Sequence, residues 1–186
     1  PHTRRLASVG RAVSYVDLRI LDPEGRPLGP GQAGEIALRG PNVMLGYLNR
    51  PEETAAVLRD GWYLTGDGGW LDEDGYLFLA GRIKDMIITG GENVYPIEVE
   101  QTIAAHEAVA EVSVIGVPDS LRGETVKAIC VLRPGFSLTG DQLSEYVGER
   151  IARFKRPRRV EFVEALPKLA DGGIDRTRVK ELHGDG

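Results

Sequence analysis

Residues 62–100, WYLTGDGGWLDEDGYLFLAGRIKDMIITGGENVYPIEVE, are the most informative stretch of this 186-residue chain. The stretch opens with strand-forming residues and a Thr65-Gly66-Asp67 turn. Two apolar runs then flank Asp74-Gly75, a dipeptide typical of a β-hairpin turn. A Gly-Arg step, a lysine and a glycine-rich loop follow before Pro96 opens a helix. The pattern changes over residues 82–85, which predicts a boundary between two structural parts.

The first predicted part, residues 1–82, is rich in strands. Residues 15–21 and 35–39 have strand-like composition and are joined by a turn-rich link. Pro51 opens a helix expected to end near Arg59, because proline is favoured in a first turn and two acidic residues follow near the positive end of the helix dipole. This part is expected to be a small β-rich module with one helix.

The second predicted part, residues 83–186, alternates helices with strands, which makes the whole chain an α+β protein. Thr139 and Gln142 have the spacing of a capping box, in which each side chain bonds the backbone of the other residue. Leu143, Val147, Ile151 and Phe154 then follow at helical spacing. Apolar runs predict strands at 86–88, 112–117, 125–132 and 160–163, and further helices are predicted at 96–106 and 176–182.

The composition is that of a globular protein, with 41% hydrophobic residues and a formal net charge of −5. The acidic balance argues against a general polyanion binder, although a local basic patch can still bind phosphates. The single cysteine, Cys130, lies in an apolar run. It predicts a buried, inert thiol in a reduced, cytoplasmic compartment.

Membrane and metal sites are not indicated. No apolar run approaches the roughly 18 residues that a membrane span needs. The N-terminal residues lack the apolar core of a signal peptide, so the chain is expected to be cut from within a longer protein. The acidic string 72–75 lacks the alternation of a calcium loop. His2, His106 and His183 are scattered, and no metal site is predicted.

Asp67 and Arg82 are the first candidate binding residues. A hairpin separates them, so antiparallel pairing can bring them together. A carboxylate can accept from ribose hydroxyls while a guanidinium donates to phosphate, so the pair suits a nucleotide. The alternative is an ordinary turn aspartate beside a surface arginine.

Two further segments offer contacts for a phosphorylated ligand. Gly90, Gly91 and Glu92 form a loop in which glycine allows a ligand to approach the main chain, although a plain connecting loop fits as well. Downstream lies a run of six cations interleaved with Phe154 and Pro157: Arg150, Arg153, Lys155, Arg156, Arg158 and Arg159. Such a run can bind phosphates or nucleic acid, or be a solvated helix end. Because no second basic stripe supports nucleic acid, a small phosphorylated ligand is favoured.

The order of these motifs, from Gly34 to Arg176, resembles the C-terminal third of acyl- and aryl-CoA ligases of the adenylate-forming superfamily. The resemblance implies that residues 1–82 are the β-rich tail of the large domain and that residues 83–186 are a mobile, mixed α/β C-terminal domain. It also implies a ligase that converts a small carboxylate and ATP with Mg²⁺ into acyl-AMP, and then transfers the acyl group to CoA. The ATP loop and the acyl pocket would lie upstream.

The same resemblance implies residue roles. Asp67 matches the residue that binds the ATP ribose, Arg82 lies beside the nucleotide, and Lys84 is at the hinge. The Gly90-Gly91-Glu92 loop matches the channel for the CoA pantetheine arm. Phe154-Lys155-Arg156-Pro157 matches a Phe-Lys-x-Pro segment whose neighbours contact the CoA nucleotide, with Phe154 and Arg156 as the contacts.

One position departs from the family pattern. The family ends with Leu-Pro-Lys-x-x-x-Gly-Lys-Ile, whose second lysine stabilises charge during adenylation, whereas this chain has Gly173 there. Losing such a donor costs roughly 10²–10³-fold in rate. Lys168 and Lys180 lie too far along the chain to substitute without rearrangement. The chain alone is expected to be inactive, and a stand-alone, non-enzymatic module that binds CoA or a partner ligase domain is the alternative.

Overall fold

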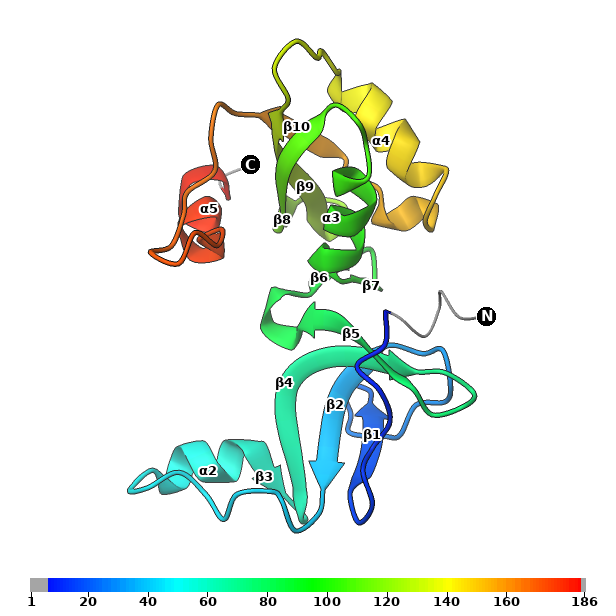
Figure 1. Ribbon diagram of the computed structural model, residues 1–186, viewed down its shortest axis with the longest axis vertical. Helices are drawn as coiled ribbons and strands as arrows, with labels where there is room; N and C mark the ends of the chain where they lie inside the picture. The colour runs from blue at the N-terminus through cyan, green and yellow to red at the C-terminus, as the bar shows by residue number, and fades with distance from the viewer. Residues whose placement is uncertain (1–6, 185–186) are drawn as a thin grey trace. The chain divides into compact units, whose positions relative to one another are not determined.

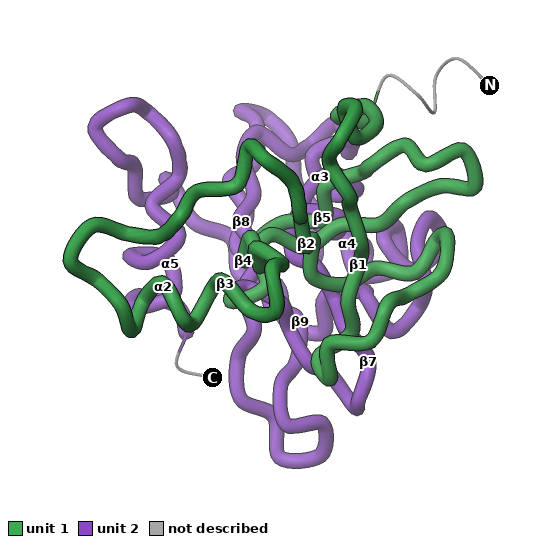
Figure 2. Tube along the Cα trace, turned by 90° about the horizontal axis from the view of Figure 1, so that it is seen from below, with its two compact units in different colours: residues 1–84 green, residues 85–186 purple. Residues whose placement is uncertain are grey.

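The computed structural model describes residues 7–184 and divides into two compact units, Pro1–Lys84 and Asp85–Gly186. Figure 2 colours the chain by unit. Each unit contains its own five-stranded sheet together with helices, so the mixed α+β class is confirmed. Among residues 7–184, no helix is long and apolar enough to cross a lipid bilayer.

Among its described residues, unit 1 is an antiparallel sheet with one helix, α2. Its sheet has the order β1-β2-β4-β3, and β5 pairs with β4. Its apolar core is Ile20, Ile36 and Leu77, with four further leucines packed around it. The elements are β1 (Asp17–Leu21), β2 (Gly34–Arg39), α2 (Pro51–Val57), β3 (Leu58–Arg59), β4 (Trp62–Leu71) and β5 (Leu77–Arg82).

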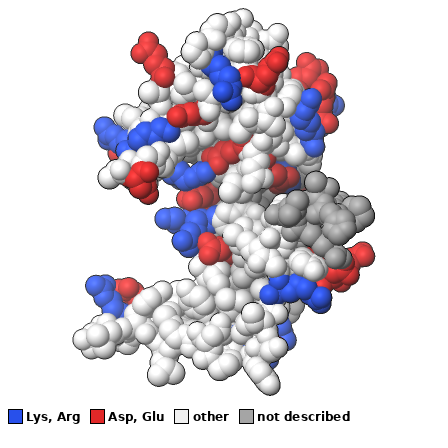
Figure 3. Space-filling model, in the orientation of Figure 1, with Lys and Arg blue, Asp and Glu red and all other residues white. Residues whose placement is uncertain are grey.

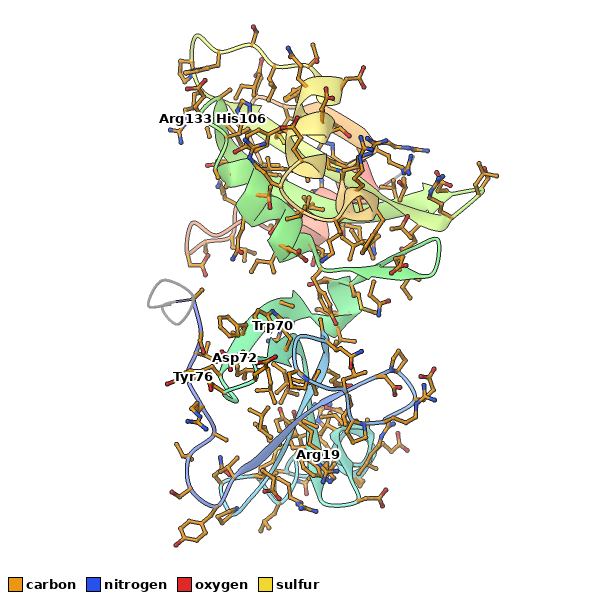
Figure 4. All side chains as sticks on the ribbon, turned by 90° about the vertical axis from the view of Figure 1, so that its right-hand side faces the viewer. Arg19, Trp70, Asp72, Tyr76, His106 and Arg133 are labelled. Carbon is orange, nitrogen blue, oxygen red and sulfur yellow. The ribbon has the colours of Figure 1, made fainter. Side chains whose placement is uncertain are left out.

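The predicted hairpin around Asp74-Gly75 is confirmed between β4 and β5. The Asp72 carboxylate accepts from the amides of Asp74 and Tyr76 at 3.0 and 2.9 Å, and Gly75 takes the left-handed φ of 79°. On the strands themselves, Trp70 and Phe78 stack with ring centroids 4.1 Å apart. Figure 4 labels Trp70, Asp72 and Tyr76 on this hairpin. The long β4–β5 pairing therefore begins from a turn that the sequence encodes locally.

The predicted end of the first helix is wrong. α2 ends at Val57, and Leu58–Arg59 pair with Tyr63 and Trp62 of β4. Asp60 and Gly61 both have positive φ, 50° and 79°, the combination that type I′ hairpin turns require. The Asp-Gly dipeptide thus makes a tight turn to β4 and draws the two residues before it into strand pairing.

Unit 2 has a sheet of order β10-β9-β6-β7, with β8 paired to the other side of β9; β10 is parallel to β9. Helices α3 and α4 cover one face and α5 the other, as Figure 1 shows. The short η1 (Ile83–Asp85) spans the boundary between the units. The elements of unit 2 are β6 (Ile87–Thr89), β7 (Glu92–Val94), α3 (Pro96–Ala104), β8 (Val109–Asp119), β9 (Gly123–Leu132), α4 (Gly140–Gly148), η2 (Arg153–Lys155), β10 (Arg159–Phe162) and α5 (Arg176–His183).

The capping box at Thr139 and Gln142 is confirmed, with both reciprocal bonds present. Leu143 and Val147 are fully buried, as their spacing predicted. The helix nevertheless ends at Gly148, so the extension to Phe154 is wrong. The backbone turns extended at Ala152, with ψ of 131°, and Phe154 lies in the separate turn η2. The apolar residues keep helical spacing in the sequence beyond the end of α4 because Ile151 packs against the same core as Leu143 and Val147.

Cys130 lies inside the larger core, where burial raises the pKa of its thiol to about 12. Because the thiolate is the nucleophile, we expect no reaction with Ellman's reagent at about pH 8 in the folded protein. Full reaction is expected after unfolding in guanidinium chloride. Rapid labelling of the folded chain would contradict this burial.

Candidate functional site

Asp67 and Arg82 face each other across β4 and β5. They are paired in register, and Arg82 Nη1 lies 3.1 Å from Asp67 Oδ1. The predicted Thr65-Gly66-Asp67 turn is wrong, since all three residues belong to β4, where Gly66 has a φ of 70°. The Thr65 hydroxyl donates to the Ile36 carbonyl at 2.8 Å and accepts from the Asp67 amide at 3.1 Å. The expected juxtaposition is therefore achieved by strand pairing with a local kink.

A cleft of about 530 Å³ lies beside this pair, within unit 1. The Glu35 carboxylate, on β2, accepts from the Gly66 amide at 3.0 Å and is thereby held at the cleft wall. Arg82 and Lys84 are exposed, so their cations are accessible to a ligand. The cleft thus places one carboxylate, which can accept hydrogen bonds from hydroxyls, near two cations of the kind that can bind phosphate. Its lining residues are Glu35, Gly66, Arg82, Ile83 and Lys84.

Gly90 and Gly91 form the turn of the β6–β7 hairpin. Their φ angles are 61° and 85°, which two-residue type I′ turns require and glycine adopts without strain. Glu92 belongs to β7 and not to an open loop, which corrects the sequence interpretation. The Gly90 amide donates to the Arg122 carbonyl at 3.0 Å. The hairpin is thus fastened to the turn that precedes β9.

The six cations of the basic run do not form one phosphate-binding surface. Arg150 stacks on Tyr146, with its guanidinium carbon 3.6 Å from the ring centroid. Lys155 is paired with Glu98. Phe154 is 38% exposed, and Arg156 is half-buried in the same segment. Figure 3 shows basic and acidic side chains mixed over the face of unit 2 that is turned toward the viewer. Only part of the run is therefore available to a ligand.

Gly173 lies in a short exposed hairpin. The Leu169 amide donates to the Gly173 carbonyl at 2.8 Å, and Gly172 takes the left-handed φ of 87° at the turn. The Gly173 amide donates to Asp171 Oδ1 at 2.9 Å. A Cβ at Gly173 would meet only this flexible carboxylate, at 3.1 Å, so the backbone there accommodates a side chain. Lys168 pairs with Glu111 at 2.8 Å and is engaged elsewhere.

The histidines have structural contacts. His106 accepts from the Ala108 amide through Nδ1 at 3.1 Å and packs edge-on against Tyr146 (Figure 4). His183 Nδ1 lies 2.9 Å from Glu161, while His2 lies outside the described residues. Within residues 7–184, no three His, Cys, Asp or Glu side chains gather where a metal ion could be held.

Two carboxylates of these sites were not found from the sequence. Glu35 reaches the cleft through the β2–β4 pairing, and Glu98 reaches η2 through the packing of α3. Neither has a local motif, because each acts on residues more than thirty positions away. Glu98 has the spacing only of an ordinary first-turn acid.

Comparison with protein families places two models on this chain. The AMP-binding enzyme model matches residues 1–48, and the AMP-binding enzyme C-terminal domain matches residues 98–172. The long-chain-fatty-acid–CoA ligase of Bacillus subtilis is 49% identical over 94% of this chain and 31% of its own length. A feruloyl-CoA synthase of Amycolatopsis is 44% identical over 97% of this chain and 37% of its own.

Solved structures show the same relationship. ATP-bound MatB from Rhodopseudomonas palustris matches with a TM-score of 0.85 and 41% identity, over 96% of this chain and 36% of that one. The o-succinylbenzoate CoA synthetase of Bacillus subtilis, in complex with its acyl-adenylate, matches with a TM-score of 0.84 and 35% identity, over 99% and 37%. The chain thus spans about a third of the length of these relatives.

The glycine hairpin yields a stability prediction. Gly90→Val places a β-branched residue at a positive φ and is expected to destabilise unit 2 by about 1–2 kcal/mol. Gly90→Asn is the control, because asparagine tolerates the left-handed region and is common at this turn position. Chemical denaturation measures both. Equal stability of the two variants would contradict the prediction, because it would show that the backbone leaves the left-handed region without cost when valine is present.

Proposed function

Because the chain belongs to the AMP-binding enzyme family and corresponds to the C-terminal portion of its relatives, we propose that it is the end of an ATP-dependent acyl-CoA synthetase. Such an enzyme joins a small carboxylate to ATP as acyl-AMP, with release of pyrophosphate, and then transfers the acyl group to the CoA thiol with release of AMP. The alignment over 94–97% of this chain with two CoA ligases supports the proposal. In this role, residues 1–82 end the large domain and 83–186 are the mobile domain.

The observation that carries the proposal is the Asp67–Arg82 pair beside the cleft. A ribose presents two neighbouring hydroxyls that can donate hydrogen bonds to the Asp67 carboxylate. Arg82 can then donate to a phosphate. Lys84, at the end of unit 1, is proposed as the hinge residue that absorbs the domain motion. The Mg²⁺ that accompanies ATP is proposed to be bound mainly by the part of the enzyme upstream of this chain.

CoA is proposed to bind unit 2. The Gly90–Gly91 turn leaves main chain uncovered, since nothing lies within 4 Å of a Cβ built on Gly91. The pantetheine arm can therefore approach the backbone closely, with Glu92 beside it. Phe154 is exposed enough to stack on the adenine, and Arg156 is proposed to contact a phosphate.

The residues of this chain do not specify the class of the acyl substrate. The relatives include ligases of long-chain fatty acids and of an aromatic acid. The acyl pocket is proposed to lie upstream, so the chain alone is expected to have no ligase activity. A non-enzymatic module that binds CoA or a ligase partner is the second candidate, and Gly173 favours it.

The nucleotide site is tested on the complete protein that contains this chain. Arg82→Ala is expected to weaken ATP binding about tenfold, the effect of losing a charge-assisted hydrogen bond. Asp67→Ala is expected to weaken it by a similar factor. Calorimetry with ATP measures both. The matched control is Asp17→Ala, which removes the 2.7 Å Asp17–Arg39 pair of the same unit, neither of whose residues lines the cleft. Unchanged ATP affinity in both cleft variants would contradict the proposed site.

Gly173 is tested by restoring a lysine. Gly173→Lys is expected to raise ATP–pyrophosphate exchange by about 10²–10³-fold in the complete protein, because an ammonium then faces the developing phosphate charge. Transfer to CoA from a supplied acyl-adenylate should change much less. Gly172→Lys is the control, since the left-handed φ of 87° strains any side chain there. No gain in exchange from Gly173→Lys would favour the non-enzymatic module.

A further inference from the structure

Lys155 and Glu98 join two segments that are far apart in the sequence. Lys155 Nζ donates to both carboxylate oxygens of Glu98, at 2.8 Å to Oε1 and 2.6 Å to Oε2. The lysine side chain is 21% exposed and the glutamate 38%. The ammonium is thus partly shielded, and two charge-assisted bonds fix its position.

Lys155 lies within one proposed CoA-contact segment, and Glu98 lies in the helix that follows the other. Glu98 is in the first turn of α3, which follows β7 and the Gly90–Gly91 hairpin with only the buried Tyr95 between them. Lys155 ends η2 and is the direct neighbour of Phe154 and Arg156. The ion pair therefore links the hairpin side of unit 2 to the segment proposed to bind the CoA nucleotide.

The backbone of this segment is weakly held by itself. η2 is a single turn in which the Lys155 amide donates to the Ala152 carbonyl at 2.8 Å and the Arg156 amide to Arg153 at 3.4 Å. Single 3₁₀ turns have poor hydrogen-bond geometry and need tertiary contacts to persist. The side-chain bonds to Glu98 supply such a contact.

We propose that Lys155 is a positioning residue. Through Glu98 it holds residues 154–156 at a set distance from the Gly90–Gly91 hairpin, so that both segments contact one CoA molecule. Two of its three ammonium hydrogens are donated to Glu98, which also neutralises its charge, so in this proposal the other cations of the run contact the phosphates. This inference rests on the proposed function and assigns to Lys155 a role different from that of the other cations in the run.

The test is CoA binding to the complete protein that contains this chain, measured by calorimetry. Glu98→Gln is expected to weaken CoA binding about tenfold. Without the ion pair, the long side chains of residues 154–156 must be immobilised when CoA binds. Lys155→Arg keeps a cation for Glu98 and should retain affinity within about twofold. The double variant Glu98→Gln with Lys155→Met should bind no more weakly than Lys155→Met alone, since both remove one interaction.

Glu111→Gln is the matched control. It removes the Lys168–Glu111 pair of the same unit, which has a similar length of 2.8 Å and a similar exposure of its glutamate, 37%. Both variants should lower the thermal midpoint equally little, but only Glu98→Gln should weaken CoA. If Glu98→Gln leaves CoA affinity unchanged or tightens it, Lys155 does not position the segment through Glu98. The positioning role is then wrong, while the proposed CoA site stands. If the unchanged protein binds neither CoA nor 3′,5′-ADP, the CoA site and the inference fail together.

Discussion

Strand β9 is the constraint on which unit 2 depends. It pairs with β8 along almost its whole length, with β10 in parallel and with β6 through Thr89 and Gly123. Both faces of the strand are buried: Ala128 and Cys130 lie in the core under α3 and α4, and Ile129 lies in the core under α5. A strand buried on both faces cannot slip in register without exposing one core, so its position is strongly specified.

The candidate CoA contacts are attached to this strand. The glycine hairpin is fastened at its start, where the Gly90 amide reaches the Arg122 carbonyl. The basic segment is fastened further along, where the Arg158 amide donates to the Val126 carbonyl at 3.0 Å. Because one attachment is to β9 and the other to the turn directly before it, two loops of ordinary composition can be held in one arrangement. The Glu98–Lys155 pair then holds the single turn η2, which precedes the Arg158 attachment.

The contribution of an ion pair to stability in this chain depends on how buried the pair is, and not on how close its residues are in the sequence. Exposed pairs such as Arg178–Glu181 contribute only about 0–1 kcal/mol each. Glu100 is different, since it is 8% exposed and its oxygens accept from the Val114 amide and from Arg176. Removing Arg176 would leave the buried Glu100 carboxylate without its ion-pair partner, which would destabilise the fold. Glu100 therefore ties α5, and the hairpin that carries Gly173, to α3 and β8.

Several features that rest on local chemistry could be predicted from the sequence. The Asp74-Gly75 turn and the capping box at Thr139 follow from backbone preferences of a few adjacent residues. The order of motifs was likewise sufficient to identify the family. Local signals also misled, since Asp60-Gly61 made a hairpin where a helix end was predicted. The tertiary structure alone decided which side chains meet across the fold. Glu35 comes to the cleft and Glu98 captures Lys155 because sheet pairing and helix packing bring together residues that no short pattern relates.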